Sequence, residues 1–312
     1  MDGNIHTKFL KQVRGCLNMK KTVSVLMLLC FIFGIFTACS NDSAADQQQE
    51  DINITVDSHY ENMDESSVRA YEKLCQAVIV GESEVKFNTS LIDDVNQLFY
   101  TCFPLYPLVE SMDILEDASG VSVTYLHPQE EHVSLVNQFF DKIDEIKDAC
   151  EYDKVSTDRY VFNVYTYLTQ NMKIDNSVVT AYDTIMQGKG YSASVCSAFE
   201  YLVLQGGGKA SHIMSTSGDQ GIISMAEFQG TWYYFNPALD IEQNEGKALT
   251  GFAMNSGRVH DSQFNYTDET PVDKVEDASF DKLENSVSYT ADGDSVNVVC
   301  SGEEDAFVLN FN

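Results

Sequence analysis

The sequence predicts an α+β fold in which helices pack on an antiparallel sheet. Apolar residues recur at helical spacing over much of the chain before residue 206, whereas short runs of strand-like residues are concentrated after it. Helices followed by a run of strands are typical of this fold class. Hydrophobic residues make up 44% of the chain and aromatic residues 11%, a composition that can form a globular core.

The first 38 residues have the organisation of a signal peptide. Met19-Lys20-Lys21 precedes an uncharged apolar run over 23–36, which is short for a membrane-spanning helix of about 20 residues. The run ends at Ala38-Cys39, a junction that resembles the bacterial lipobox, where small residues precede a lipid-modified cysteine. The resemblance implies cleavage before Cys39, acylation of Cys39 and an extracytoplasmic protein anchored to the cell membrane. An uncleaved membrane helix is the alternative.

Two polar stretches flank this signal. Residues 1–18 precede a signal that is complete from Met19 onward, and we interpret them as an upstream mis-start. Residues 39–60 are polar and acidic and show no apolar periodicity, which predicts a flexible tether behind the lipidated cysteine.

Residues 61–154 are expected to form a mostly helical α+β part. The most regular pattern lies over 133–146, where Val136, Phe139 and Ile143 share one face of an amphipathic helix. The other expected elements are helices over 68–80 and 91–103 and a hairpin over 112–126 around Ala118-Ser119-Gly120.

Strands become frequent in the second half of the chain. A helix over 160–172 and a helix over 193–204, stopped by three glycines at 206–208, precede them. A strand is expected over 210–215, and 222–228 pairs with 231–235 as a hairpin around Gln229-Gly230. Residues 276–312 are expected to form a β-hairpin appendage, with strands over 286–290 and 295–300 around Asp292-Gly293.

Charge and cysteine usage exclude several functions. The formal net charge is −29, and such a surface repels nucleic acid. No phosphate loop, dinucleotide fingerprint or metal-ligand spacing is present, so the sequence predicts neither a cofactor nor a metal. After Cys39, five scattered cysteines without a CxxC pair argue against a disulfide framework and favour small buried apolar residues; they are Cys75, Cys102, Cys150, Cys196 and Cys300.

One region carries a resemblance to a known family. Residues 181–192 read AYDTIMQGKGYS, residues 198–202 read AFEYL, and 227–237 read EFQGTWYYFNP. These motifs resemble the bacterial transglutaminase-like superfamily, in which a Gly-Lys-Gly-x-Cys turn opens the helix that bears the nucleophile, and a later strand bears the catalytic histidine. The resemblance implies a transglutaminase-like domain over 155–275 with a papain-like core.

The catalytic triad of that family is altered in this chain. In active members, a cysteine at a helix N-terminus gains thiolate character, a histidine acts as base and acid, and an aspartate orients the histidine. The resemblance places Ser192, Gly221 and Asn236 at these three positions. Because a hydroxyl needs a base and glycine cannot provide one, the resemblance implies a catalytically inactive domain. We interpret Ser192 as the N-cap of its helix.

Two other residues are candidates for residual catalysis, one as the nucleophile and one as the base. Cys196 lies one turn after Ser192, although its neighbours Val195 and Phe199 favour a core position. His212 is expected on the following strand and is a candidate displaced base. A thiol or serine hydrolase or acyltransferase would need an imidazole within hydrogen-bond reach of Cys196 or Ser192.

The leading hypothesis is non-enzymatic. The inherited groove would bind a peptide, glycan or protein partner outside the membrane. Trp232 and Tyr234 are expected to pack within strands, and an exposed ring at either position would be a candidate for stacking on a ligand. A third hypothesis is a structural envelope protein whose groove is closed by bulky side chains.

Overall fold

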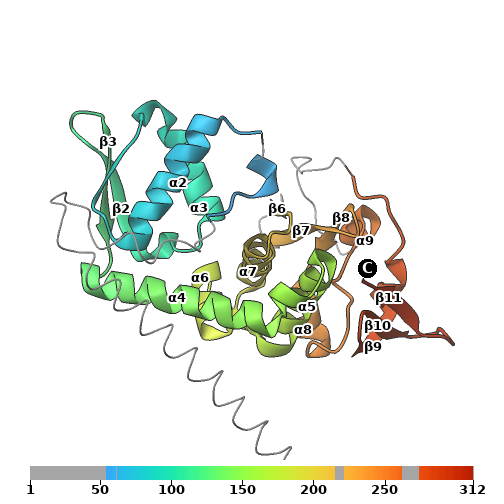
Figure 1. The fold of residues 1–312 in the computed structure, drawn as a ribbon. Helices are drawn as coiled ribbons and strands as arrows, with labels where there is room; N and C mark the ends of the chain where they lie inside the picture. Colours follow the sequence, from blue (N-terminus) through green and yellow to red (C-terminus); the bar gives the residue numbers. More distant parts are fainter. Residues whose placement is uncertain (1–53, 61, 215–220, 262–273, 312) are drawn as a thin grey trace, which may run out of the picture. The chain divides into compact units, whose positions relative to one another are not determined.

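Three antiparallel sheets, one short parallel strand pair and a set of helices make up the described part of the chain (Figure 1). The computed structural model describes residues 54–311, apart from residue 61 and the segments 215–220 and 262–273. The α+β prediction is confirmed. Residues 53–312 form a compact unit by themselves. The predicted signal peptide, Cys39 and most of the predicted tether lie outside the described residues.

Among the described residues, no helix combines the length and the apolar character needed to cross a membrane.

The N-terminal part is mostly helical, as predicted, with one small sheet. The carboxylate of Asp64 accepts a hydrogen bond from the Ser66 amide, so the first helix begins one turn earlier than expected. The predicted hairpin is present, and a short strand joins it where Gly120 approaches the Val85 carbonyl too closely for a Cβ atom. The sheet has the order β1-β3-β2. Its elements are α2 (Glu65–Val80), β1 (Glu84–Lys86), α3 (Ile92–Cys102), β2 (Val109–Ile114) and β3 (Gly120–Tyr125).

The amphipathic helix predicted over 133–146 is the longest helix of the described chain, α4 (Gln129–Ala149). Its apolar stripe is buried, including Val136, Phe139 and Ile143. The helix begins directly after Pro128, because a proline just outside the first turn is compatible with a helix start whereas an interior proline is not. The prediction missed one turn at the beginning, where the sequence is polar.

The central layer places helix α7 (Ser192–Gln205) against a three-stranded antiparallel sheet. Its strands are β6 (Ala210–Met214), β7 (Ile222–Phe228) and β8 (Thr231–Phe235), in the order β6-β7-β8. Helix α7 contacts β7, and α5, α6 and α8 pack against its other sides. The remaining elements are α5 (Thr157–Asn171), β4 (Lys173–Ile174), α6 (Ala181–Gln187), β5 (Lys189–Gly190) and α8 (Pro237–Asn244).

The third antiparallel sheet lies at the C-terminal end of the described chain, in the order β9-β10-β11. The predicted hairpin around Asp292-Gly293 is confirmed, and the third strand was missed. The sheet shares an aromatic core with the central layer, because the Phe311 ring lies 5.3 Å from Phe162 on α5 and 6.1 Å from Phe228 on β7. The elements are α9 (Ser256–Asp261), β9 (Ser286–Asp292), β10 (Ser295–Cys300) and β11 (Phe307–Asn310).

Candidate functional site

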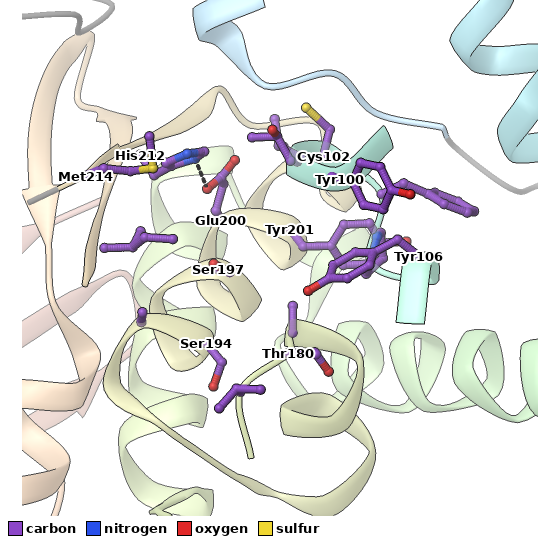
Figure 2. Close-up of a pocket in the computed structure, with 18 residues that line it drawn as sticks. Tyr100, Cys102, Tyr106, Thr180, Ser194, Ser197, Glu200, Tyr201, His212 and Met214 are labelled. Atoms are coloured by element: carbon purple, nitrogen blue, oxygen red, sulfur yellow. Dashed lines mark hydrogen bonds and ion pairs between the residues drawn. The ribbon is translucent and has the colours of Figure 1, made fainter. Parts of the chain in front are cut away.

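A cavity of about 230 Å³ follows one face of α7 (Figure 2). Opposite α7, its walls come from the segment 100–106 at the end of α3, from 179–181 before α6, and from Met214 and Ile222 on the sheet. Tyr100 is 52% exposed and Met214 62% exposed, so the cavity is open and has apolar side chains at its mouth. The residues that α7 contributes share one helical face; they are Ala193, Ser194, Ser197, Glu200, Tyr201 and Leu204.

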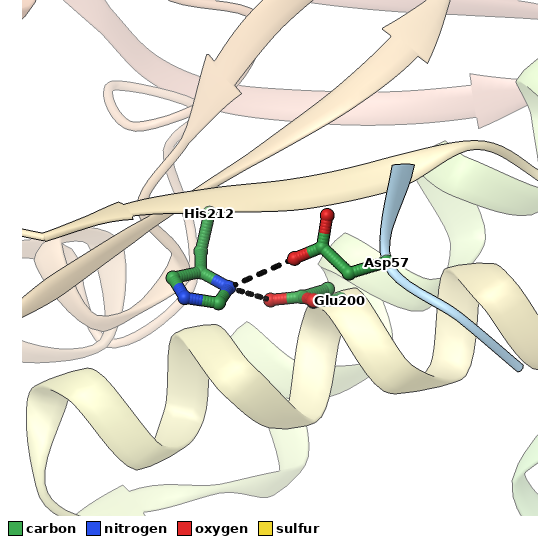
Figure 3. A group of neighbouring side chains, drawn as sticks. All are labelled: Asp57, Glu200 and His212. Carbon is green, nitrogen blue, oxygen red and sulfur yellow. Dashed lines mark hydrogen bonds and ion pairs between the residues drawn. The ribbon is translucent and has the colours of Figure 1, made fainter. Parts of the chain in front are cut away.

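Three ionisable side chains, two of which line this cavity, lie close together (Figure 3). Nδ1 of His212 lies 3.0 Å from Oε2 of Glu200 and 3.1 Å from Oδ2 of Asp57. Glu200 comes from the middle of α7 and His212 from β6, whereas Asp57 precedes the 3-10 helix Ser58–Tyr60. All three side chains are largely withdrawn from solvent, and Asp57 is fully buried. Glu200 and His212 also line the cavity.

Burial and mutual contact shift the protonation of this cluster. Burial opposes the charged form of His212, but the carboxylates of Glu200 and Asp57 outweigh it and raise the pKa of His212 well above 6.5. Burial raises the pKa of Glu200, and the charge of Asp57 adds to this. For Asp57, burial acts in the opposite direction, but its close approach to His212 and Glu200 and the positive charge of His212 lower its pKa. A charged imidazole, an ionised Asp57 and a protonated Glu200 therefore balance the buried charges at neutral pH.

The positions expected to correspond to a triad gather around the first turns of α7. Ser192 is the first residue of the helix. A Cβ atom on Gly221 would lie 2.6 Å from the Tyr191 hydroxyl and 2.9 Å from Cβ of Ala193, on either side of Ser192. Asn236 caps α8 by accepting a hydrogen bond from the Leu239 amide, and its Oδ1 lies 3.8 Å from Sγ of Cys196, one turn into α7.

The N-cap interpretation of Ser192 is wrong. The N-cap of α7 is Tyr191, which makes no side-chain capping bond. The hydroxyl of Ser194 fixes this end of the helix instead. It accepts a hydrogen bond from Thr184 at 2.8 Å and lies within hydrogen-bond distance of the carbonyl oxygens of Tyr191 and Val178. The half-buried Ser192 side chain is therefore not used for capping.

The two candidates for residual catalysis are directed to different partners. Cys196 is fully buried and its Sγ lies near Asn236, whereas the imidazole of His212 pairs with Asp57 and Glu200. Within the described residues, no hydrogen bond joins His212 to Cys196 or Ser192. Burial also raises the pKa of the Cys196 thiol to about 12. The arrangement therefore lacks the nucleophile–base contact that the hydrolase hypothesis requires.

The aromatic residues selected from the sequence lie away from the cavity. Trp232 is half-buried on β8, opposite Glu227 of β7. Tyr234 is fully buried, so its ring offers no face to a ligand. Its backbone pairs with Met254. The exposed ring at the cavity is Tyr100, which contacts Tyr106 edge-to-face at 5.8 Å. The expectation of an exposed, stacking ring at Tyr234 is therefore wrong, whereas the ring of Tyr100 is exposed at the cavity.

Sequence reasoning missed Glu200 and Asp57. Glu200 had a signal, because it is a charged residue inside an otherwise apolar stretch of α7. Asp57 had none, since it lies in the polar stretch 39–60 that was expected to be a flexible tether. The tether prediction is wrong from residue 54 onward, because Thr55 accepts a hydrogen bond from Tyr71 and Asp57 is buried against His212.

No family model matches the sequence, and no curated protein matches it either.

The thiols of the described chain are expected to react slowly with iodoacetamide. All five are buried, and the rise in the pKa of Cys196 from 9.0 to about 12 reduces its thiolate fraction at pH 8 about a thousandfold. Labelling of the chain from Ser40 onward should be much slower in the native than in the denatured state. It should increase with pH without reaching a plateau below pH 10, as followed by mass spectrometry.

The variant Cys196→Ala is the control for this measurement. Its native labelling should equal that of the wild type, because Cys196 contributes nothing at neutral pH. A Cys196 that labels faster in the native than in the denatured protein would show an activated thiol.

Proposed function

We propose that this chain is an extracytoplasmic lipoprotein, anchored through Cys39, whose catalytically inactive transglutaminase-like domain binds a peptide in the cavity beside α7. The observation that carries the proposal is the position of the cavity. It opens beside Ala193 and Ile222, which are the neighbours of the altered positions Ser192 and Gly221. A substrate site that has lost its catalytic groups would lie in this place.

The local geometry supports the correspondence with the family. Gly221 lies against Tyr191 and Ala193, the neighbours of Ser192, and Asn236 lies near Cys196 one turn further along, so positions separated by up to 44 residues in sequence lie beside the first turns of one helix. Along the chain, helix α7 and the β7–β8 hairpin occur in the same order as the sequence motifs that resemble the family, with strand β6 between them.

The same geometry supports the loss of catalysis. Gly221 has a φ of 72°, a left-handed conformation that disfavours histidine, and a side chain there would press against Tyr191 and Ala193. The backbone is therefore adapted to glycine at the position of the missing base. Among the described residues, no histidine forms a hydrogen bond with Ser192, and His212 is paired with two carboxylates.

A peptide fits the cavity better than a glycan or a folded protein. The volume of about 230 Å³ holds one or two side chains. Within the described chain, β6 pairs only with β7, and it contributes His212 and Met214 to the cavity wall, while Ser58–Tyr60 also lies against it. An extended peptide can hydrogen-bond to the part of such a strand that remains open while it places a side chain in the neighbouring pocket.

The competing functions have weaker support. A hydrolase or acyltransferase built on Cys196 would need a thiolate that burial suppresses. A purely structural role with a closed groove conflicts with the open cavity and the exposed Tyr100 ring at its mouth.

Acylation of Cys39 is tested by metabolic labelling. In a bacterial host, the wild-type chain should incorporate labelled palmitate and sediment with membranes, whereas Cys39→Ser should lose both properties. Cys30→Ser, which lies within the predicted signal, should keep them. Labelling that persists in Cys39→Ser would contradict the lipobox assignment.

Position 192 should still activate a thiol. In Ser192→Cys, the exposed amides at the start of α7 should lower the pKa of the new thiol below its ordinary value of about 8.5. Ser197→Cys is the matched control, because it lies on the same cavity face but beyond the first turn, where the dipole effect has decayed. We expect Ser192→Cys to be labelled at least tenfold faster at pH 6.5.

Equal rates in the two cysteine variants would mean that position 192 does not occupy the nucleophile position. The pH dependence of labelling separates the effect of thiol pKa from that of solvent access. A lower thiol pKa shifts the midpoint of the curve of labelling rate against pH, whereas access changes only the maximal rate.

Peptide binding is tested with a library of tripeptides in which the central residue is varied. Backbone NMR shifts of the chain from Ser40 onward should change at Ser197, Tyr201 and Met214 with at least one class of peptide. Ser197→Phe should weaken that binding at least tenfold, because the new ring occupies the cavity. The control Ser134→Phe, on the exposed side of α4, should bind normally. Shifts confined to other surfaces, or none, would refute the proposed function.

A further inference from the structure

We propose that Asp57, Glu200 and His212 form a binding site for one divalent transition-metal ion, such as Zn²⁺, which opens into the cavity beside α7. The inference does not depend on peptide binding, since an ion can occupy this site in the absence of any organic ligand. It departs from the sequence analysis, which predicts no metal.

The donor atoms are close enough together to coordinate one ion. Oδ2 of Asp57, Oε2 of Glu200 and Nδ1 of His212 all lie within 4.8 Å of one another, and the two distances from Nδ1 are 3.0 and 3.1 Å. Ligand atoms about 2.0–2.2 Å from a tetrahedral zinc ion are separated by about 3.3 Å. Small rotations of the carboxylates therefore suffice to enclose the ion.

A buried oxygen in this cluster supports a cation independently of that spacing. The single N–H at Nδ1 of His212 can point at only one carboxylate, and it is directed to Glu200. Oδ2 of Asp57 lies 3.1 Å from the same nitrogen but has no hydrogen bond of acceptable geometry among the described residues, although Asp57 is fully buried. Such an oxygen is costly unless a cation satisfies it. A metal ion would displace the Nδ1 proton of His212 and the proton of Glu200, and it would contact all three donors.

The three ligands are held by separate parts of the fold. The other oxygen of Asp57 accepts a hydrogen bond from the His59 amide at 2.7 Å, which fixes the orientation of this carboxylate. Glu200 lies in the middle of α7, and His212 lies on β6, where it is paired with Ser224 of β7. The site is therefore positioned before an ion binds.

The chemistry of the donors selects the class of ion. One imidazole nitrogen with two carboxylate oxygens suits Zn²⁺, Mn²⁺ or Co²⁺ better than Mg²⁺ or Ca²⁺, which prefer oxygen-only sites. Three protein ligands leave at least one coordination position for water or another oxygen ligand. Because Glu200 and His212 line the cavity, this position is expected to face it.

Metal binding is measured on the chain from Ser40 onward, after treatment with EDTA. Zn²⁺ is titrated by calorimetry in physiological NaCl with excess Ca²⁺, so that loose binding to the acidic surface is saturated or screened. We expect one Zn²⁺ per chain, a higher thermal midpoint, and at least about 100-fold weaker binding in Glu200→Gln and in His212→Gln. The control is His127→Gln/Glu131→Gln, which removes an exposed histidine–glutamate pair and should bind Zn²⁺ as the wild type does.

Co²⁺ provides a second measurement that needs no variant. Bound to the wild-type chain, it should show visible ligand-field bands of a low-symmetry nitrogen and oxygen site, and these bands should disappear when Zn²⁺ displaces the Co²⁺ ion.

The proposal is overturned if less than one Zn²⁺ binds per chain, if folded Glu200→Gln and His212→Gln bind as tightly as the wild type, or if Co²⁺ gives only its aqueous spectrum. In that case the cluster is a proton-linked ion pair that fastens residues 54–60 to the domain.

Discussion

The burial of α7 is the constraint on which the rest of the domain depends. The sheet covers one side of this helix, and α5, α6 and α8 cover others, so that nearly every side chain from Ala193 to Gln205 is buried. A helix in such a position can carry a polar side chain only where another element supplies a partner. Ser194 obtains its partner from Thr184, and Glu200 obtains its partners from β6 and from the segment before α2. The polar residues of α7 therefore determine which distant segments must pack against it.

This constraint explains why the chain before α2 is part of the domain. Asp57 lies 143 residues before Glu200, and the contact encloses a long stretch of chain. A surface ion pair would not offset the conformational entropy lost when this stretch of chain is ordered. This cluster is buried, however, and removal of one member would leave an uncompensated charge. Asp57 and Ser58–Tyr60 therefore lie against β6. The ion cluster fastens this segment to the central layer of the domain.

The sequence predicted the elements whose patterns are local. The stripe of Val136, Phe139 and Ile143 and the turn at Asp292-Gly293 are each specified by a few neighbouring residues, and both were located correctly. β11 and the short pair β4–β5 were missed because their residues show little alternation and pair only when distant segments approach. The cluster was missed for the same reason, since residues 57, 200 and 212 share no motif. Ser192, Gly221 and Asn236 were proposed from a family resemblance, which supplies long-range relationships that periodicity cannot provide.

The electrostatics of α7 differ between its N-terminal end and its middle. A thiolate at the first turn of a helix is stabilised by free amides and by the helix dipole, and this effect decays within one turn. Ser192 is uncharged and does not use this stabilisation.

Glu200 lies two turns further along, where the amides are already bonded within the helix and the dipole offers no compensation. Its charge must therefore be balanced by a cation that comes from outside the helix. His212 supplies one positive charge against two carboxylates, and the second charge must come from a proton or from a bound ion. The buried cluster therefore places the charged groups that contact this helix at its centre, where a cation is favoured.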